Sequence, residues 1–194
     1  MKTLWIFLLA YLAGSVNFAV IFFKLTGRED PRQSFSGNAG TTNVYRQAGF
    51  LWAAFILLLD VGRAMAVAWV SGYFLRPFLM PWAAFFLVLG NRFPCFHGFR
   101  GGKGVANYLG FTIMTAPWAA LASAAVWVFV YGLARVPFIA SFFMVFTLAF
   151  GQASACQWHI TATCGAMAAF ALILLNHRKN VADYLKRAGK DVSR

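Results

Sequence analysis

The longest stretch of this chain without an Asp, Glu, Lys or Arg runs for 41 residues, from Val136 to Asn176. A second uncharged stretch, Gly104 to Ala134, is 31 residues long. A helix rises about 1.5 Å per residue, so about 20 apolar residues cross a bilayer core about 30 Å thick. A water-soluble protein of 194 residues cannot bury runs of this length, because too much of a small protein lies at its surface. The chain is therefore predicted to be an all-α, polytopic membrane protein.

Apolar runs and polar interruptions predict about seven transmembrane helices. The 31-residue run is too long for one crossing, and Thr115-Ala116-Pro117 is a natural break, so we expect two short spans there. If that run is instead one strongly tilted helix, the count falls to six. The expected spans cover about 3–23, 48–75, 77–90, two within 104–134, and two within 136–176 divided by a polar turn at 152–158. No soluble domain or repeat interrupts them, so residues 1–194 are expected to form a single domain.

Basic residues are distributed unevenly between the two predicted sides of the membrane. The chain has 17 Lys and Arg against 5 acidic residues, and the bases lie between apolar runs rather than on a soluble domain, which argues against a nucleic-acid partner. The four segments 24–47, 91–103, Arg135 and 177–194 fall on one side and contain 14 of the 17 bases. Cytoplasmic loops are rich in Lys and Arg, so the N-terminus is expected outside and the C-terminus in the cytoplasm.

The segment Phe99-Arg100-Gly101-Gly102-Lys103-Gly104 has the composition of a phosphate-binding loop. Glycines let successive backbone N–H groups turn toward one anion, and a helix starting at Gly104 would point its positive end there. It is not a Walker A loop, because the spacing of glycines differs and no Ser or Thr follows Lys103. The alternative is a basic turn that only anchors a span at the membrane surface.

Two further polar segments are expected on the same side. The segment from Ser36 to Arg46 combines hydroxyls, amides, glycines and an arginine, which suit a polyol or a phosphate, although a plain surface loop has similar composition. His177 and Asn180 follow the last span three residues apart, so a helix places them on one face. The alternative for them is a basic helix end that reaches toward the membrane surface.

Several other polar residues have mainly structural explanations. Asp60 and Arg63 are three residues apart inside a span, where charges either line a pocket or form a structural pair. His97 and His159 have no partner nearby in sequence, and we interpret both as structural. The cysteines lack the spacing of metal ligands, so no metal site is expected; they are Cys95, Cys156 and Cys164.

The motifs resemble the bacterial acyl-phosphate:glycerol-3-phosphate acyltransferase family over nearly the whole chain. The similarity is carried in order by Gly14-Ser15, by Ser36-Gly37-Asn38-x-Gly-x-Thr42-Asn43-Val44-x-Arg46-x-x-Gly49 and by Asp60. It continues with Gly90-x-x-Phe-Pro94-x-Phe-x-x-Phe-Arg100-Gly-Gly-Lys103-Gly-Val-Ala, with Arg135 and Ser141, and with His177-Arg-x-Asn180. That family has seven spans with its signature loops in the cytoplasm, the same topology as the apolar runs predict.

The resemblance implies that a fatty acyl group is transferred from acyl phosphate to glycerol 3-phosphate in the bacterial inner membrane, the first step of phospholipid synthesis. Acyl phosphate is already activated, so no cofactor is expected. Either His177 or the substrate's own phosphate could remove the hydroxyl proton. The implied catalytic residues are Ser36, Lys103, His177 and Asn180. The implied substrate-binding residues are Gly37, Asn38, Thr42, Asn43, Arg46, Arg100, Gly101, Gly102, Gly104 and Ser141.

Departures from the family pattern leave alternatives open. Phe35 stands where the family carries glycine, Asn91 where it carries histidine, and Phe138 where it carries a hydroxyl residue. The two phenylalanines are expected to reshape the substrate pocket. The other functions considered are a divergent paralogue with low activity, and a transporter or binder of a phosphorylated small molecule. A transporter should show inverted repeats and broken helices that meet at the middle of the bilayer.

Overall fold

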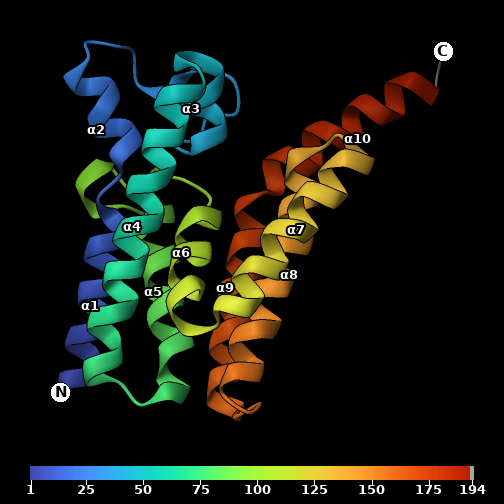
Figure 1. Cartoon of the computed structure of the whole chain (residues 1–194). Helices are drawn as coiled ribbons and strands as arrows, with labels where there is room; N and C mark the ends of the chain where they lie inside the picture. Colours follow the sequence, from blue (N-terminus) through green and yellow to red (C-terminus); the bar gives the residue numbers. More distant parts are fainter. Residues whose placement is uncertain (193–194) are drawn as a thin grey trace.

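The protein is a bundle of helices in two groups that lie side by side, one drawn in blue to green and the other in yellow to red (Figure 1). The computed structural model describes residues 1–192, with side chains to residue 186; the last two residues of the predicted cytoplasmic segment 177–194 lie outside it. The helices are α1 (Lys2–Ser15), α2 (Phe18–Leu25), α3 (Thr41–Ala48), α4 (Phe50–Phe74), α5 (Met80–Arg92), α6 (Val105–Thr115), α7 (Pro117–Ala134), α8 (Pro137–Ala155), α9 (Ile160–Asn176) and α10 (Arg178–Val192). Three 3₁₀ turns accompany them, η1 (Pro31–Gln33), η2 (Pro77–Leu79) and η3 (Cys95–His97). The described chain contains no strand, which confirms the all-α prediction.

Five helical segments of the described chain are long and apolar enough to cross a membrane, and six if α9 and the start of α10 count as one span bent by 43°. The break at Ala116–Pro117 is confirmed, because α6 ends and α7 begins there. However, the 11 residues of α6 rise only about 16 Å, roughly half of a bilayer core. The protein is thus multi-pass, while seven crossings stay a prediction.

The first predicted span is interrupted between α1 and α2, at Val16 and Asn17. The Asn17 side chain caps α2 by accepting a hydrogen bond from the Val20 backbone. The Val16 carbonyl left free by the break accepts a hydrogen bond from the Arg63 side chain of α4. Arg63 also bonds the Asp60 carboxylate at 3.0 Å and the Asn107 side-chain oxygen of α6 at 2.5 Å. Of the two readings of Asp60 and Arg63, the structure supports the structural pair.

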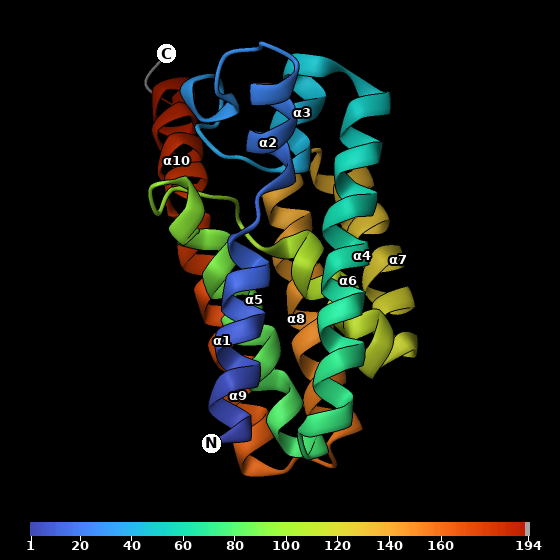
Figure 2. The same cartoon turned by 90° about the vertical axis from the view of Figure 1, so that its left-hand side faces the viewer.

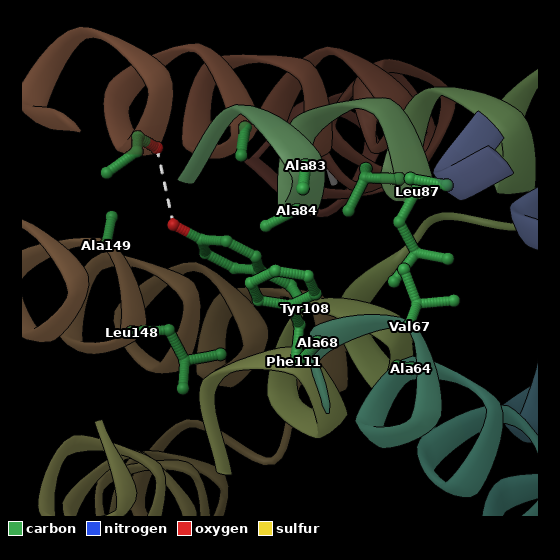
Figure 3. Close-up of a cluster of buried hydrophobic side chains, with 14 of the residues drawn as sticks. Ala64, Val67, Ala68, Ala83, Ala84, Leu87, Tyr108, Phe111, Leu148 and Ala149 are labelled. Atoms are coloured by element: carbon green, nitrogen blue, oxygen red, sulfur yellow. Dashed lines mark hydrogen bonds between the residues drawn. The ribbon is translucent and has the colours of Figure 1, made fainter. Parts of the chain in front are cut away.

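Helix α6 occupies the centre of the bundle, where its aromatic side chains fill the core (Figure 3). Tyr108 is fully buried among small and aliphatic residues of α4, α5 and α8, and its hydroxyl donates to the Ala166 carbonyl of α9 at 3.4 Å. The hydroxyl must find such a partner because no water is available at this depth. The short helix is therefore packed against four others, α4, α5, α7 and α8.

Helices α1 and α5 approach each other closely because glycines face one another. A Cβ added to Gly14 would run into the Leu87 carbonyl, and a Cβ added to Gly90 would run into the Tyr11 carbonyl. Small residues at such crossings let membrane helices pack through their backbones. This contact places the end of α5, and the loop that follows it, beside the α1–α2 break.

Candidate active site

The three polar segments singled out from the sequence meet at one end of the bundle. Both views place α3 and α10 at this end and the N-terminus at the other (Figures 1 and 2). The Asn176 side chain donates a hydrogen bond to the Lys103 carbonyl at 3.1 Å. A Cβ added to Gly37 would lie 3.6 Å from the Lys179 ammonium. Residues far apart in sequence therefore surround one region.

The polar loop (residues 34–40) is folded around the side chain of Asn43, the third residue of α3. Asn43 is 1% exposed, and its amide nitrogen lies 2.6 Å, 3.2 Å and 2.9 Å from the carbonyl oxygens of Pro31, Ser34 and Asn38. Its amide oxygen accepts from the Ser36 backbone at 3.5 Å. We expected Asn43 to bind substrate. In the structure both ends of its amide are hydrogen-bonded to backbone groups of residues 31–38, so Asn43 stabilises the loop.

Other polar groups of this segment are available to a ligand. Among the described residues, neither the Ser36 hydroxyl nor the Arg46 guanidinium has a hydrogen-bond partner in the protein. Thr42 and Arg46 are four residues apart on α3, which places them on one face, and both are exposed. Asn38 bonds the Ser36 carbonyl through its amide nitrogen at 3.0 Å, which leaves its oxygen as an acceptor.

The glycine-rich loop (residues 98–104) passes so close to the end of α5 that glycine is required at several positions. A Cβ on Gly101 would collide with the Asn91 carbonyl, and one on Gly102 would lie 2.8 Å from the Asn91 side-chain oxygen. Gly104 has a φ of +92°, which favours glycine, and a Cβ there would lie 2.6 Å from Val88. The loop is thereby pressed against α5, with its Gly102 N–H donated to the Asn91 carbonyl at 3.0 Å.

Lys103 is the half-buried cation of this loop. Burial, and secondarily the positive charge of Arg46, lowers the pKa of Lys103 to about 8. Arg46 and Lys103 are therefore close enough for their charges to interact, although they come from different segments. Among the described residues, the backbone N–H groups of 103–106 also lack partners in the protein. Together they form the open N-terminus of α6, a suitable site for an anion.

His177 and Asn180 follow α9 at the same end of the bundle. His177 is only 2% exposed, packs in a T-shaped contact with the Phe142 ring, and has Nδ1 2.8 Å from the Ile173 carbonyl oxygen. Because a carbonyl only accepts, Nδ1 carries a proton, and Nε2 is the nitrogen that can accept one. Asn180 is half-buried, and within the described residues its side chain has no hydrogen-bond partner.

Ser141 and the two unusual phenylalanines make contacts of their own within the protein, and their effect on the substrate pocket stays a prediction. The Ser141 hydroxyl donates to the Pro137 carbonyl at 2.9 Å and accepts from Trp127 of α7 at 3.3 Å, so it joins α7 to α8. Phe138 packs edge-on against Phe142 and Tyr184. Phe35 is 67% exposed with a φ of +52°. A glycine would adopt this conformation without strain, which explains why that position suits glycine.

No sequence motif indicates a role for Asp30 and Arg32, which form one of the two ion pairs among the described residues. Arg32 also donates to carbonyls of the glycine-rich region, at His97 and Arg100. A single signal was present, namely Asp followed by Pro, which is typical of the start of a helical turn. Nothing in the spacing of charges indicated the contact across 65 residues of chain.

Positive charge in this region is not balanced by nearby acids. The two ion pairs of the described chain are Asp30–Arg32 and Asp60–Arg63. No described carboxylate lies within ion-pair distance of the remaining cations around the site, which include Arg46, Arg92, Arg100, Lys103, Arg178 and Lys179. A cluster of this kind favours an anionic ligand with more than one negative charge.

Comparison with known proteins agrees with this geometry. A family model described as glycerol-3-phosphate acyltransferase matches residues 4–187. A glycerol-3-phosphate acyltransferase of Bordetella pertussis is 38% identical over 189 residues, covering 92% of this chain and 86% of the relative. Crystal structures of PlsY, an integral membrane glycerol 3-phosphate acyltransferase, are also similar. Its glycerol 3-phosphate form has a TM-score of 0.84 at 31% identity, and its lysophosphatidic acid form has 0.81 at 30%; each match covers 96% of this chain and 93% of that chain.

The family match covers most of the chain, and the Bordetella pertussis relative is matched over 86% of its length. The similarity includes the polar loop, the glycine-rich loop and the segment after α9, which the fold brings together. This chain therefore belongs to the glycerol-3-phosphate acyltransferase family.

Proposed function

We propose that this protein transfers a fatty acyl group from acyl phosphate to glycerol 3-phosphate. The observation that carries the proposal is that the glycine-rich loop, the polar loop and the segment after α9 meet, without a nearby acid, at the open N-terminus of α6. Both substrates contain phosphate, so the site needs cations and free N–H groups rather than a nucleophile. The glycerol 3-phosphate form of the similar structure supports the choice of acceptor.

The reaction requires one bond to form and one to break. The hydroxyl oxygen of glycerol 3-phosphate attacks the carbonyl carbon of acyl phosphate, and the bond from that carbon to the phosphate oxygen breaks. The products are 1-acylglycerol 3-phosphate and inorganic phosphate. Lys103 and the N–H groups of α6 stabilise the negative charge on the departing phosphate, while Arg46 and Ser36 hold the acceptor.

Two groups could take the proton of the attacking hydroxyl: Nε2 of His177 and an oxygen of the substrate's own phosphate. The deep burial of His177 favours the phosphate, because a general base must reach the hydroxyl within about 3 Å. In that case His177 orients the end of α9, and Asn180 offers its amide to the substrates. Replacement of His177 by glutamine, which keeps a donor and an acceptor, separates these roles.

We further propose that the site faces the cytoplasm of a bacterial inner membrane, where glycerol 3-phosphate is dissolved. The N-terminus and Arg76 then lie outside, in keeping with the excess of basic residues at the site's end. The acyl chain of the donor lies in the bilayer. The alternative, transport of a phosphorylated molecule, is disfavoured because the polar segments gather at one end rather than at mid-bilayer.

Purified protein in detergent or proteoliposomes, supplied with acyl phosphate and labelled glycerol 3-phosphate, should form labelled lysophosphatidic acid. Acyl-CoA and acyl carrier protein serve as competing donors. Absence of product with every donor, together with uptake of label into proteoliposomes, would instead support the transporter. Product formed from acyl-CoA alone would contradict the proposed donor.

A further inference from the structure

The side chains of Asp30 and Arg32 form a bidentate ion pair next to the candidate site. The Asp30 carboxylate accepts from Nε of Arg32 at 2.9 and 3.0 Å, from Nη2 at 2.5 Å and from the Arg32 backbone at 2.9 Å. The Arg32 guanidinium lowers the pKa of the Asp30 carboxyl, so the pair stays charged at neutral pH. The carboxylate holds one edge of the guanidinium and leaves Nη1 pointing elsewhere.

The free edge of Arg32 binds the glycine-rich region. Nη1 donates to the His97 carbonyl at 2.6 Å and to the Arg100 carbonyl at 2.7 Å. Between these two carbonyls lie Gly98 and Phe99, with φ values of +65° and +56°. A left-handed conformation is costly for phenylalanine, so this turn needs contacts that hold it. Arg32 supplies them by binding both of its ends.

The same short segment also binds α3. The Pro31 carbonyl accepts from the Asn43 side chain at 2.6 Å and from the Gln47 side chain at 3.1 Å. Asp30-Pro31-Arg32 therefore contacts both the helix that carries Arg46 and the loop that carries Lys103. These hydrogen bonds fix the position of the glycine-rich loop relative to α3.

Arg32 itself has little left to offer a ligand. A guanidinium has five N–H donors. Those of Nε and Nη1, and one of Nη2, are directed at Asp30 and at the two carbonyls, which leaves at most one free. Arg32 also draws two carbonyl oxygens to its own side of the loop. Carbonyl oxygens would repel a phosphate, so this leaves the N–H groups after residue 102 free to face the anion.

We propose that Arg32, held by Asp30, is a positioning residue that aims Lys103 and the free N–H groups of α6 at the substrate phosphate. This inference rests on the proposed function. It assigns Arg32 an effect through the glycine-rich loop and no contact with substrate.

The test compares Arg32→Gln and Arg32→Lys with the matched control Arg28→Gln. Arg28 belongs to the same loop, but it is exposed and its side chain makes a single hydrogen bond within the described residues, to the Gln47 carbonyl at 3.4 Å. The first measurement is the reactivity of Lys103 toward acetic anhydride against pH, followed by peptide mass spectrometry. In wild type and Arg28→Gln the midpoint should lie at about 8, and in Arg32→Gln it should move toward 10.5, the ordinary value for lysine.

The second measurement is steady-state acyl transfer with acyl phosphate and glycerol 3-phosphate. Arg32→Gln should lower kcat/KM by about 100-fold, as expected when a catalytic group is displaced by about 1 Å. Arg28→Gln should stay near wild type. Arg32→Lys keeps the charge but lacks the guanidinium that binds Asp30 and the two carbonyls at once. Its kcat/KM and its Lys103 titration midpoint should therefore fall between those of wild type and Arg32→Gln.

Several outcomes would overturn the inference. An unchanged Lys103 midpoint in Arg32→Gln contradicts it, whether or not activity is lost. If Arg32→Gln does not give a monodisperse protein, Arg32→Lys decides instead. The inference is contradicted if that variant has the kinetics and the Lys103 reactivity of wild type. If wild type itself transfers no acyl group, the proposed function fails, but the Lys103 midpoints still decide whether Arg32 positions the loop.

Discussion

The side-chain amide of Asn176 donates a hydrogen bond to the backbone carbonyl of Lys103 at 3.1 Å. This contact joins the end of α9 to the start of α6 across 73 residues of chain. It places His177, the next residue, beside the glycine-rich loop. The expected grouping of Lys103 with the segment after α9 therefore has a direct structural basis.

Removal of the Lys103 charge should nearly abolish acyl transfer. A charge that acts on developing negative charge contributes about 2.7–4 kcal/mol to the transition state, so Lys103→Ala should lose about 100- to 1,000-fold in kcat. Arg100→Ala should lose far less, because the Arg100 side chain is exposed and the contact seen for this residue is through its carbonyl. The rates are compared in membranes that contain equal amounts of protein, with Arg76→Ala as control. Near-normal rates for Lys103→Ala would show that the glycine-rich loop is not part of the active site.

The pH dependence of activity should report the titration of Lys103. Its ammonium predominates below its pKa of about 8, so kcat/KM should fall as the pH rises through that value. Arg46 contributes to this lowering, so Arg46→Gln should move the alkaline limb to higher pH while weakening glycerol 3-phosphate binding. A limb at the same pH in both proteins would show that Lys103 does not control it. The measurement is kcat/KM for glycerol 3-phosphate between pH 6 and pH 10.

Replacement of Arg63 should destabilise the bundle more than it changes substrate affinity. Arg63→Met leaves the Asp60 carboxylate, the Val16 carbonyl and the Asn107 oxygen without their partner inside the bundle. Loss of one partner from a buried ion pair typically costs about 3–5 kcal/mol. Thermal unfolding in detergent should show the loss, and the double variant Asp60→Asn/Arg63→Met should recover part of it. A pocket-lining role would instead raise KM with no change in the unfolding temperature.

Glycine at position 35 should stabilise the protein. The left-handed conformation costs a non-glycine residue about 1–2 kcal/mol, and Phe35 is 67% exposed, so little packing is lost in Phe35→Gly. Phe35→Ala is the matched control, since it removes the ring but keeps the strain, and it should give no comparable gain. Kinetics decide whether the ring also affects binding: a lower KM for glycerol 3-phosphate in both variants would support the crowding that we expected from the sequence.

Cysteine labelling tests the predicted orientation. In a protein without its native cysteines, a cysteine at position 103 should be reached from the cytoplasmic side and one at position 76 from outside. The expectation follows from the 14 basic residues in the four segments on the site's side. Labelling of position 103 from the outside only would reverse the topology.

Local sequence features are sufficient to predict the helical membrane architecture and the residue types of the site. A small soluble protein cannot bury uncharged helices that are longer than the bilayer is thick, so such runs predict membrane spans. A helix break such as Ala116-Pro117 is caused by the proline itself, so it can also be predicted from neighbouring residues. The glycines and cations of 100–104 also form a contiguous motif. Their meaning depends on backbone freedom and charge, which are properties of the residues themselves.

Which polar side chains stabilise the fold and which remain free depends on contacts between distant segments. Asn43 and Arg46 belong to one motif, yet Asn43 is enclosed by its own loop while Arg46 has no partner among the described residues. Arg32 belongs to none of the sequence motifs, and two of its partners are carbonyls 65 and 68 residues away. Backbone carbonyls occur at every residue, so no side-chain pattern records such contacts. They arise only when packing, as at Gly14 and Gly90, brings distant segments within hydrogen-bond distance.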